Sequence, residues 1–178
     1  MSRISKVNPQ EATGRAKELL DGVQAKLGMT PNMMRAMAAS PAVLDAYLQF
    51  SNALGKGALS ARVREQIALA VGQANSCDYC LAAHSAIGKM LGLSGDQILD
   101  ARHGRAIDSA TSAALQLARR IVDARGLVSD ADLATARSGG LDDAAIAEVV
   151  ANVALNLFTN YFNHVTATEV DFPPAAKL

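Results

Sequence analysis

The chain has 178 residues with 17 basic and 17 acidic side chains, 50% of its residues are hydrophobic, and Trp is absent. Its formal net charge of zero gives no broad electrostatic reason to expect nucleic acid or an anionic membrane as a partner, so small molecules or other proteins are expected instead. The alanine-rich, aromatic-poor composition argues against a disordered chain and favours packed helices in a single domain over residues 1–178.

Helical periodicity runs through nearly the whole chain, and no alternating strand pattern lasts more than a few residues. The first helix is predicted over residues 12–27, where Gly28 supplies a stop. A short second helix begins at Pro31, and a third is predicted over residues 40–54 with Pro41 at its first helical position. Further helices are predicted over residues 60–74, 77–91, 108–125, 130–137 and 142–166, with a short helical turn at residues 94–95. The predicted fold class is all-α, a compact multi-helix fold.

Three features of the sequence indicate the cellular compartment of the protein. The N-terminal stretch lacks an apolar core of signal-peptide length followed by a small-residue cleavage site. The most apolar run, residues 144–158, is interrupted by Asn152 and Asn156 and is shorter than the roughly 20 residues that a bilayer requires. The two cysteines are only three positions apart, which does not build the disulfide framework of a small secreted protein. We therefore expect a cytoplasmic protein without a membrane partner.

The chemistry of the chain is concentrated in Glu65, Cys77, Cys80 and His84. If a helix begins at Cys77, then Cys80 and His84 follow on the same face, so the two sulfurs can meet beside an imidazole. A helix N-terminus and a nearby imidazole stabilise a thiolate, which lowers a cysteine pKa from about 8.5 into the range of roughly 3.5 to 7.5. The preceding helix can fold back so that the Glu65 carboxylate reaches His84, and such a pair can move protons.

With this spacing, the sequence resembles the alkyl hydroperoxidase D-like group of the carboxymuconolactone decarboxylase superfamily. The family pattern is a Glu, eleven residues, CxxC, three residues and a His, which Glu65, Cys77, Cys80 and His84 reproduce in order and spacing. The stretch PNMMRAMAASPAVLDAYLQF and the tail FNHVTATEVDFPP also resemble the peroxidase-related branch. The resemblance covers most of the chain and implies an alkyl hydroperoxidase D-like helical fold.

The resemblance also implies a thiol-dependent peroxidase or disulfide oxidoreductase that acts on alkyl hydroperoxides. In that cycle Cys80 attacks the peroxide and becomes a sulfenic acid, Cys77 resolves it into a disulfide, and His84 with Glu65 relays protons. A dithiol or protein reductant, for example one of the lipoyl type, then reduces the disulfide, and no bound cofactor or metal is expected. A homo-oligomer, a trimer or a hexamer, is expected from the family and from the apolar helical surface.

Two features of the sequence do not agree with this catalytic cycle. The helix dipole favours a thiolate at Cys77, the cysteine nearer the N-terminus, whereas the resemblance assigns the attack to Cys80. The founding alkyl hydroperoxidase D has a His immediately before its second cysteine, where this chain has Tyr79. The substrate and the electron donor of that protein therefore do not transfer directly.

Other interpretations remain open. The cysteines can be two buried, inert side chains, or they can bind zinc with His84 and one of Glu65, His103 or His164. A carboxymuconolactone decarboxylase-like lyase or isomerase would use acid–base chemistry without redox change. A redox-sensing interaction module would use the disulfide to change its assembly state.

The last long helix carries a polar stripe at every fourth position. The stripe consists of Asn152, Asn156, Asn160 and His164. Buried polar groups need partners, so these residues either line the cysteine cavity or make hydrogen bonds between helices or subunits, and we favour the second interpretation. Four methionines near the N-terminus are interpreted as pliable packing residues, namely Met29, Met33, Met34 and Met37.

Overall fold

A computed structural model describes residues 2–178, and this part of the chain folds into nine helices without a strand. The helices are α1 (Gly14–Leu27), α2 (Asn32–Met37), α3 (Pro41–Leu54), α4 (Ala61–Ala74), α5 (Asp78–Met90), α6 (Gly95–Arg102), α7 (Ser109–Asp123), α8 (Asp130–Ser138) and α9 (Asp143–Thr166). The all-α prediction is confirmed. None of these described helices combines the length and the apolarity that crossing a membrane requires.

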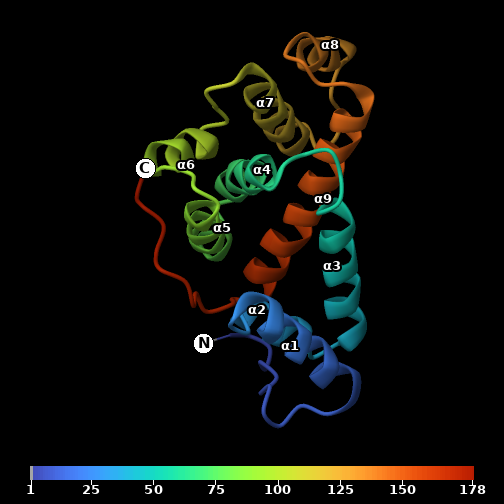
Figure 1. The fold of residues 1–178 in the computed structure, drawn as a ribbon, viewed down its shortest axis with the longest axis vertical. Coiled ribbons are helices and arrows are strands. Elements are labelled where there is room, and N and C mark those ends of the chain that lie inside the picture. The colour runs from blue at the N-terminus through green and yellow to red at the C-terminus, as the bar shows by residue number, and fades with distance from the viewer. Residues whose placement is uncertain (1) are drawn as a thin grey trace.

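Helix α4 lies at the centre of the molecule. It packs against α5, α6, α7 and α9, which surround it in Figure 1. Its residues 66–72 are all buried, as expected of a helix with neighbours on every side. Ile67, Leu69 and Val71 form the main hydrophobic core with side chains of α7 and α9. The helix that carries Glu65 is therefore among the best-supported elements of the fold.

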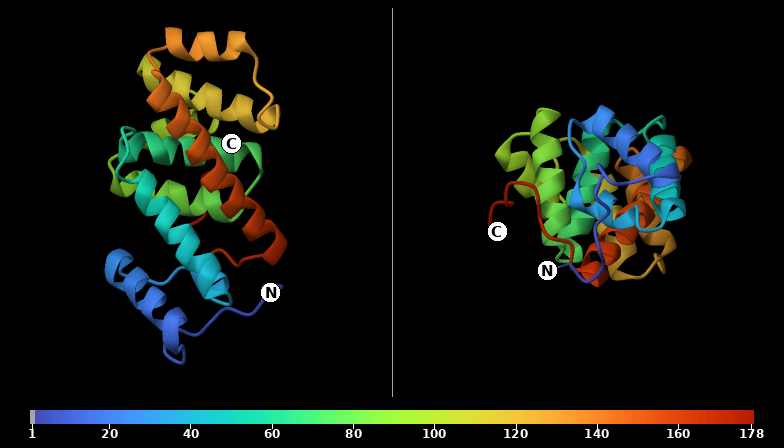
Figure 2. Two further views of the ribbon diagram at one scale, coloured as in Figure 1. Left: turned by 90° about the vertical axis from the view of Figure 1, so that its right-hand side faces the viewer. Right: turned by 90° about the horizontal axis from the view of Figure 1, so that it is seen from below.

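A second hydrophobic cluster joins the N-terminal helices to the cysteines. Leu20 of α1, Met37 of α2 and Leu44 of α3 are almost completely buried and belong to the same cluster as Cys77 and Cys80. Helix α9 runs obliquely along the molecule from α7 and α8 toward α1 and α2 (Figure 2, left). The cysteine pair thus lies where α5 and α9 meet the N-terminal helices.

The helix boundaries follow the local signals in the sequence. Gly28 ends α1 with a φ of 73°, and the Ser60 hydroxyl accepts a hydrogen bond from Val63 N–H at the start of α4. Helix α1 begins at Gly14 rather than at residue 12, because residues 9–11 form a turn that precedes it. The predicted turn at residues 94–95 continues as the complete helix α6, which a capping box at Ser94 begins.

The C-terminal tail is extended, as the paired prolines predict, and lies across α5 toward α6 (Figure 1). The Phe172 ring packs edge-on against Tyr79 with ring centroids 5.8 Å apart. Arg102 of α6 is buried and donates a 2.6 Å hydrogen bond to the carbonyl oxygen of Ala176. These contacts fasten the tail over the beginning of α5, so it forms part of the surroundings of the cysteines.

Candidate active site

The cysteine pair occupies the first turn of α5. A short connection after α4 turns sharply at Ser76, whose φ is 53°, and Cys77 then takes the N-cap position of α5. Cys77 and Cys80 form a disulfide with their Cα atoms 5.3 Å apart. Their exposed fractions are only 1% and 3%. The predicted pairing of the two sulfurs is therefore present, in a buried position.

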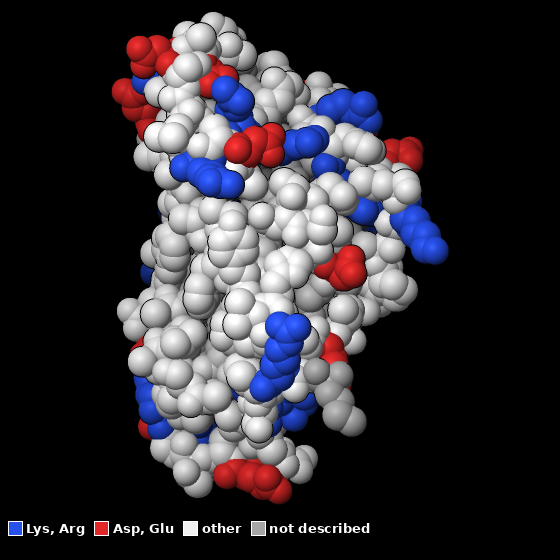
Figure 3. Space-filling view, turned by 180° about the vertical axis from the view of Figure 1, so that it is seen from behind, with Lys and Arg blue, Asp and Glu red and all other residues white. Residues whose placement is uncertain are grey.

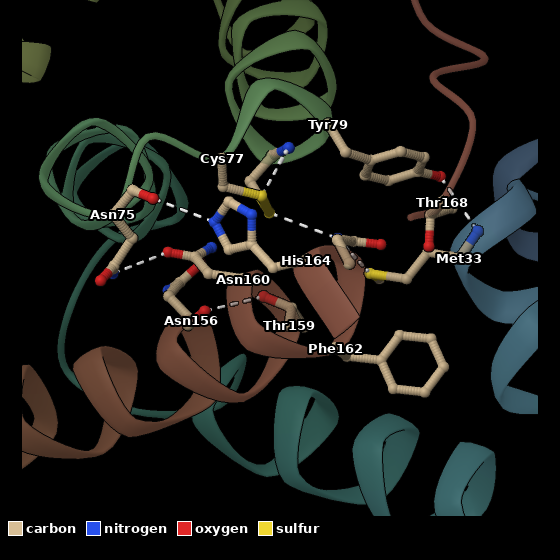
Figure 4. Close-up of a disulfide and its surroundings, with 12 residues drawn as sticks. Met33, Asn75, Cys77, Tyr79, Asn156, Thr159, Asn160, Phe162, His164 and Thr168 are labelled. Carbon is tan, nitrogen blue, oxygen red and sulfur yellow. Dashed lines mark hydrogen bonds between the residues drawn. A yellow bond between two sulfur atoms is a disulfide. The ribbon is translucent and has the colours of Figure 1, made fainter. Parts of the chain in front are cut away.

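The two sulfurs receive different hydrogen-bond donors. The backbone N–H of Cys80 donates to Cys77 Sγ over 3.4 Å, so it is the first cysteine that accepts a hydrogen bond from the helix N-terminus. Cys80 Sγ instead accepts from the side chain of Asn163 on α9, whose Nδ2 lies 3.4 Å away. Figure 4 shows this contact passing from the disulfide to α9. The backbone and a side chain thus distinguish the two sulfurs.

Glu65 and His84 form the predicted pair. Glu65 of α4 places its Oε2 atom 2.6 Å from Nδ1 of His84 on α5. The two side chains are 18% and 22% exposed, so they reach solvent to a greater extent than the sulfurs do. Because the carboxylate occupies Nδ1, the other ring nitrogen of His84 is the one that can exchange a proton. His84 lies one helical turn after Cys80 on the same face of α5.

Tyr47 of α3 lies near this pair, which the sequence did not indicate. Burial raises the pKa of the Tyr47 hydroxyl to about 12, and the negative charge of Glu65 acts in the same direction. The hydroxyl therefore stays protonated at neutral pH. Tyr47 is thus a neutral polar side chain whose titration is affected by the charge of Glu65.

Tyr79, which stands between the cysteines in the sequence, points away toward α2 and the tail. Its hydroxyl oxygen accepts a 3.2 Å hydrogen bond from the backbone N–H of Met33 (Figure 4). Burial raises the pKa of this hydroxyl, so it remains neutral. Where the founding family member has a His, this chain thus has a side chain that holds α2 against α5.

The polar stripe of α9 divides into two parts. Asn152 and Asn156 donate to carbonyl oxygens of α9 itself. Asn160 Oδ1 accepts from Asn75 Nδ2 over 2.9 Å, and His164 Nε2 lies 2.9 Å from the carbonyl oxygen of the same Asn75. The favoured interpretation as hydrogen bonds between helices is confirmed for Asn160 and His164. Figure 4 shows that both also lie beside the disulfide.

The structure also bears on the candidate zinc ligands. Within residues 2–178, no three His, Cys, Asp or Glu side chains are grouped as metal ligands. His103 lies exposed at the C-terminal end of α6, and His164 is bound to Asn75. Met33 and Met37 are buried in the cluster around the cysteines, as expected of packing residues.

Comparison with known proteins supports the family resemblance. Residues 41–124, which contain Glu65, both cysteines and His84, match the carboxymuconolactone decarboxylase family. A peroxidase-related protein of a Silicibacter species is 29% identical with a TM-score of 0.76, over 90% of this chain and 84% of that chain. An alkylhydroperoxidase AhpD core, a peroxidase-related protein of Ralstonia eutropha, is 25% identical with a TM-score of 0.85, over 96% of this chain and 92% of that chain. The predicted alkyl hydroperoxidase D-like fold is confirmed.

A third structure shares the fold alone. It is a debrominase in complex with 2,3,4-tribromopyrrole, 17% identical with a TM-score of 0.80, over 94% of this chain and 91% of that chain. No curated protein matches the sequence significantly. The fold is thus associated with more than one chemistry, so it does not by itself determine the activity of this chain.

Proposed function

We propose that this chain, whose residues 41–124 match the carboxymuconolactone decarboxylase family and whose fold is alkyl hydroperoxidase D-like, is a thiol-dependent peroxidase that reduces alkyl hydroperoxides. The observation that carries the proposal is the disulfide between Cys77 and Cys80, one helical turn from a His84 side chain that is bound to Glu65. A dithiol that closes into a disulfide supplies the two electrons that peroxide reduction needs.

The reaction begins at the reduced pair. The Cys80 thiolate attacks the terminal oxygen of the hydroperoxide, the O–O bond breaks, and the alkoxide takes a proton from His84 and leaves as the alcohol. Cys80 is now a sulfenic acid. Cys77, as a thiolate, attacks that sulfur, so that an S–S bond forms, the S–O bond breaks and the hydroxide takes up a proton to leave as water. One hydroperoxide has then been reduced to alcohol and water, and the two thiols have been oxidised to one disulfide.

A second dithiol completes the cycle by thiol–disulfide exchange, in which its own two thiols become a disulfide and the cysteines are reduced again. The buried position of the sulfurs favours a slender donor over a bulky one. We propose a dithiol of the lipoyl type, alone or carried by a partner protein.

Peroxide consumption with dihydrolipoamide tests the proposed function. The expected result is continuous turnover by the wild-type protein, with one disulfide of the donor formed for each hydroperoxide consumed. The measurement follows peroxide loss and free thiols in parallel. A protein whose cysteines stay reduced under excess peroxide would contradict the proposal and bring forward the lyase interpretation.

We further propose that copies of the chain associate through the outer faces of α3 and α9, which lie side by side in Figure 2. On the face opposite to that of Figure 1, charged side chains gather toward the two ends of the molecule, leaving a largely uncharged zone between them (Figure 3). Several large apolar side chains of the two helices are exposed, namely Phe50, Val150, Phe158, Tyr161 and Val165. An apolar face of this kind is typical of an interface between subunits.

The predicted trimer or hexamer can be measured by light scattering coupled to size-exclusion chromatography. Val165→Glu places a charge on the proposed interface, where the side chain is 68% exposed, and is expected to reduce the oligomer to smaller species. Leu127→Glu changes a side chain that is 85% exposed outside these helices and serves as the control. A wild-type protein that is monomeric at all concentrations, or equal effects of the two variants, would refute this interface.

A further inference from the structure

The side chain of Asn163 lies against the sulfur of Cys80. Asn163 comes from α9, is 5% exposed, and directs its Nδ2 atom to Cys80 Sγ at 3.4 Å and to Met33 Sδ at 3.3 Å. Figure 4 shows Met33, which belongs to α2, on the same side of the disulfide as the ring of Tyr79. Among the described residues, the amide nitrogen thus has only sulfur atoms as acceptors, and one of them is the sulfur assigned to the attack.

The other end of the same amide differs. Asn163 Oδ1 is buried and accepts no hydrogen bond from any residue between 2 and 178. Leaving a buried carbonyl oxygen unpaired destabilises the folded state, and hydrogen bonds to neutral sulfur are weak. Packing alone would be served better by Leu, which has the same branching. The amide is therefore not explained by the stability of the fold.

The electrostatics of the two cysteines indicate what the amide does. Cys77 Sγ already accepts a backbone N–H at the N-terminus of α5, which favours the thiolate at that position. Cys80 is the third residue of the helix, its own N–H is directed to Cys77, and its side chain is nearly inaccessible to water, so a thiolate there needs a donor from another element. Asn163 Nδ2 is the donor that the structure brings to this sulfur.

We propose that Asn163 is a catalytic residue that stabilises the Cys80 thiolate through its Nδ2–H and thereby makes Cys80, rather than Cys77, the attacking sulfur. This inference rests on the proposed peroxidase function. A hydrogen bond to a charged acceptor is about twice as strong as one to a neutral acceptor, so the contact strengthens when the thiol ionises. The proton released from Cys80 passes to the relay of His84 and Glu65, and the amide itself neither gains nor loses a proton.

The test is a titration of Cys80 in a Cys77→Ser background, followed by the ultraviolet absorbance of the thiolate. Asn163→Leu is expected to raise the measured pKa of Cys80 by about one to two pH units, as loss of a hydrogen bond to a charged group predicts. The melting temperature is expected to stay the same or to rise, because the unpaired carbonyl oxygen is removed with the amide. Asn163→Ala provides a smaller side chain and is expected to raise the pKa in the same direction.

Asn152→Leu is the matched control. Asn152 is also a buried asparagine of α9, but its amide donates to the carbonyl oxygen of Glu148, so the pKa of Cys80 should not change. An unchanged pKa in both Asn163 variants would overturn the inference, and so would an equal rise in the control. The titration needs no peroxide. Failure of the proposed function appears instead as absence of turnover in the wild-type protein, so the two failures are distinguishable.

Discussion

A Cys80→Ser variant is expected to lose peroxide turnover by on the order of 10³-fold or more, because the serine hydroxyl is a poor nucleophile at neutral pH and cannot form the disulfide. Cys77→Ser should behave differently. It retains the attacking sulfur, so in the absence of a dithiol donor it is expected to consume one equivalent of hydroperoxide and then stop, with Cys80 left as a sulfenic acid. Mass spectrometry should find one added oxygen atom in this variant and none in Cys80→Ser.

Comparing the two variants identifies the attacking sulfur, because each variant removes one sulfur from the same turn of α5. If Cys80→Ser consumed the equivalent of peroxide and Cys77→Ser did not, the N-terminal cysteine would be the nucleophile, as the helix dipole alone predicts. The double variant with both serines serves as the blank. Peroxide consumption that survives in the double variant would mean that the two cysteines are not the reductant.

Much of the helical fold could be predicted from local signals in the sequence. Ser60 caps α4 as expected, and Gly28 ends α1 in the left-handed conformation that glycine favours. Such signals act within a few residues, so they are readable without knowledge of the neighbours. The pairing of Glu65 with His84 was also predictable, because the helices that carry them are consecutive and joined by a short connection.

The remainder of the site depends on which distant elements become neighbours. Asn163 lies 83 positions after Cys80, and the polar stripe with a four-residue spacing on α9 indicates Asn160 and His164 instead. Asn163 follows Asn160 by three positions and therefore shares its side of the helix, which is the signal that could have indicated it. Tyr47 gives no such signal, because only the packing of α3 places its hydroxyl near Glu65.

Burial separates the two halves of the candidate site. The sulfurs are 1% and 3% exposed, whereas the side chains of Glu65 and His84 are 18% and 22% exposed. In the proposed relay, His84 therefore takes the proton of the buried sulfur toward solvent. The hydroxyls of Tyr47 and Tyr79 do not compete for this proton, because burial raises the pKa of both and keeps them neutral.

His84→Ala should therefore slow turnover by about 10²- to 10⁴-fold, the range that a general acid–base contributes. Glu65→Gln leaves the imidazole in place but removes the carboxylate that orients it, so its expected loss is smaller. Because Glu65 acts through His84, the double variant should be no slower than His84→Ala alone. The measurement is kcat/KM for the four proteins. Glu11→Gln is the control, because it changes an exposed carboxylate that is distant from Glu65 in the sequence.

Tyr47 provides a readout of Glu65 that does not depend on activity. Its pKa is raised to about 12 first by burial and then by the charge of Glu65, so removing that charge in Glu65→Gln should lower the pKa. A tyrosinate titration by ultraviolet absorbance, compared with Tyr47→Phe to identify the signal, measures this change. An additive double variant together with an unchanged Tyr47 titration would mean that Glu65 is not the carboxylate of the relay. If Glu65→Gln lowers the Tyr47 pKa and the effects of Glu65→Gln and His84→Ala on kcat/KM are not additive, Glu65 and His84 act in one proton path.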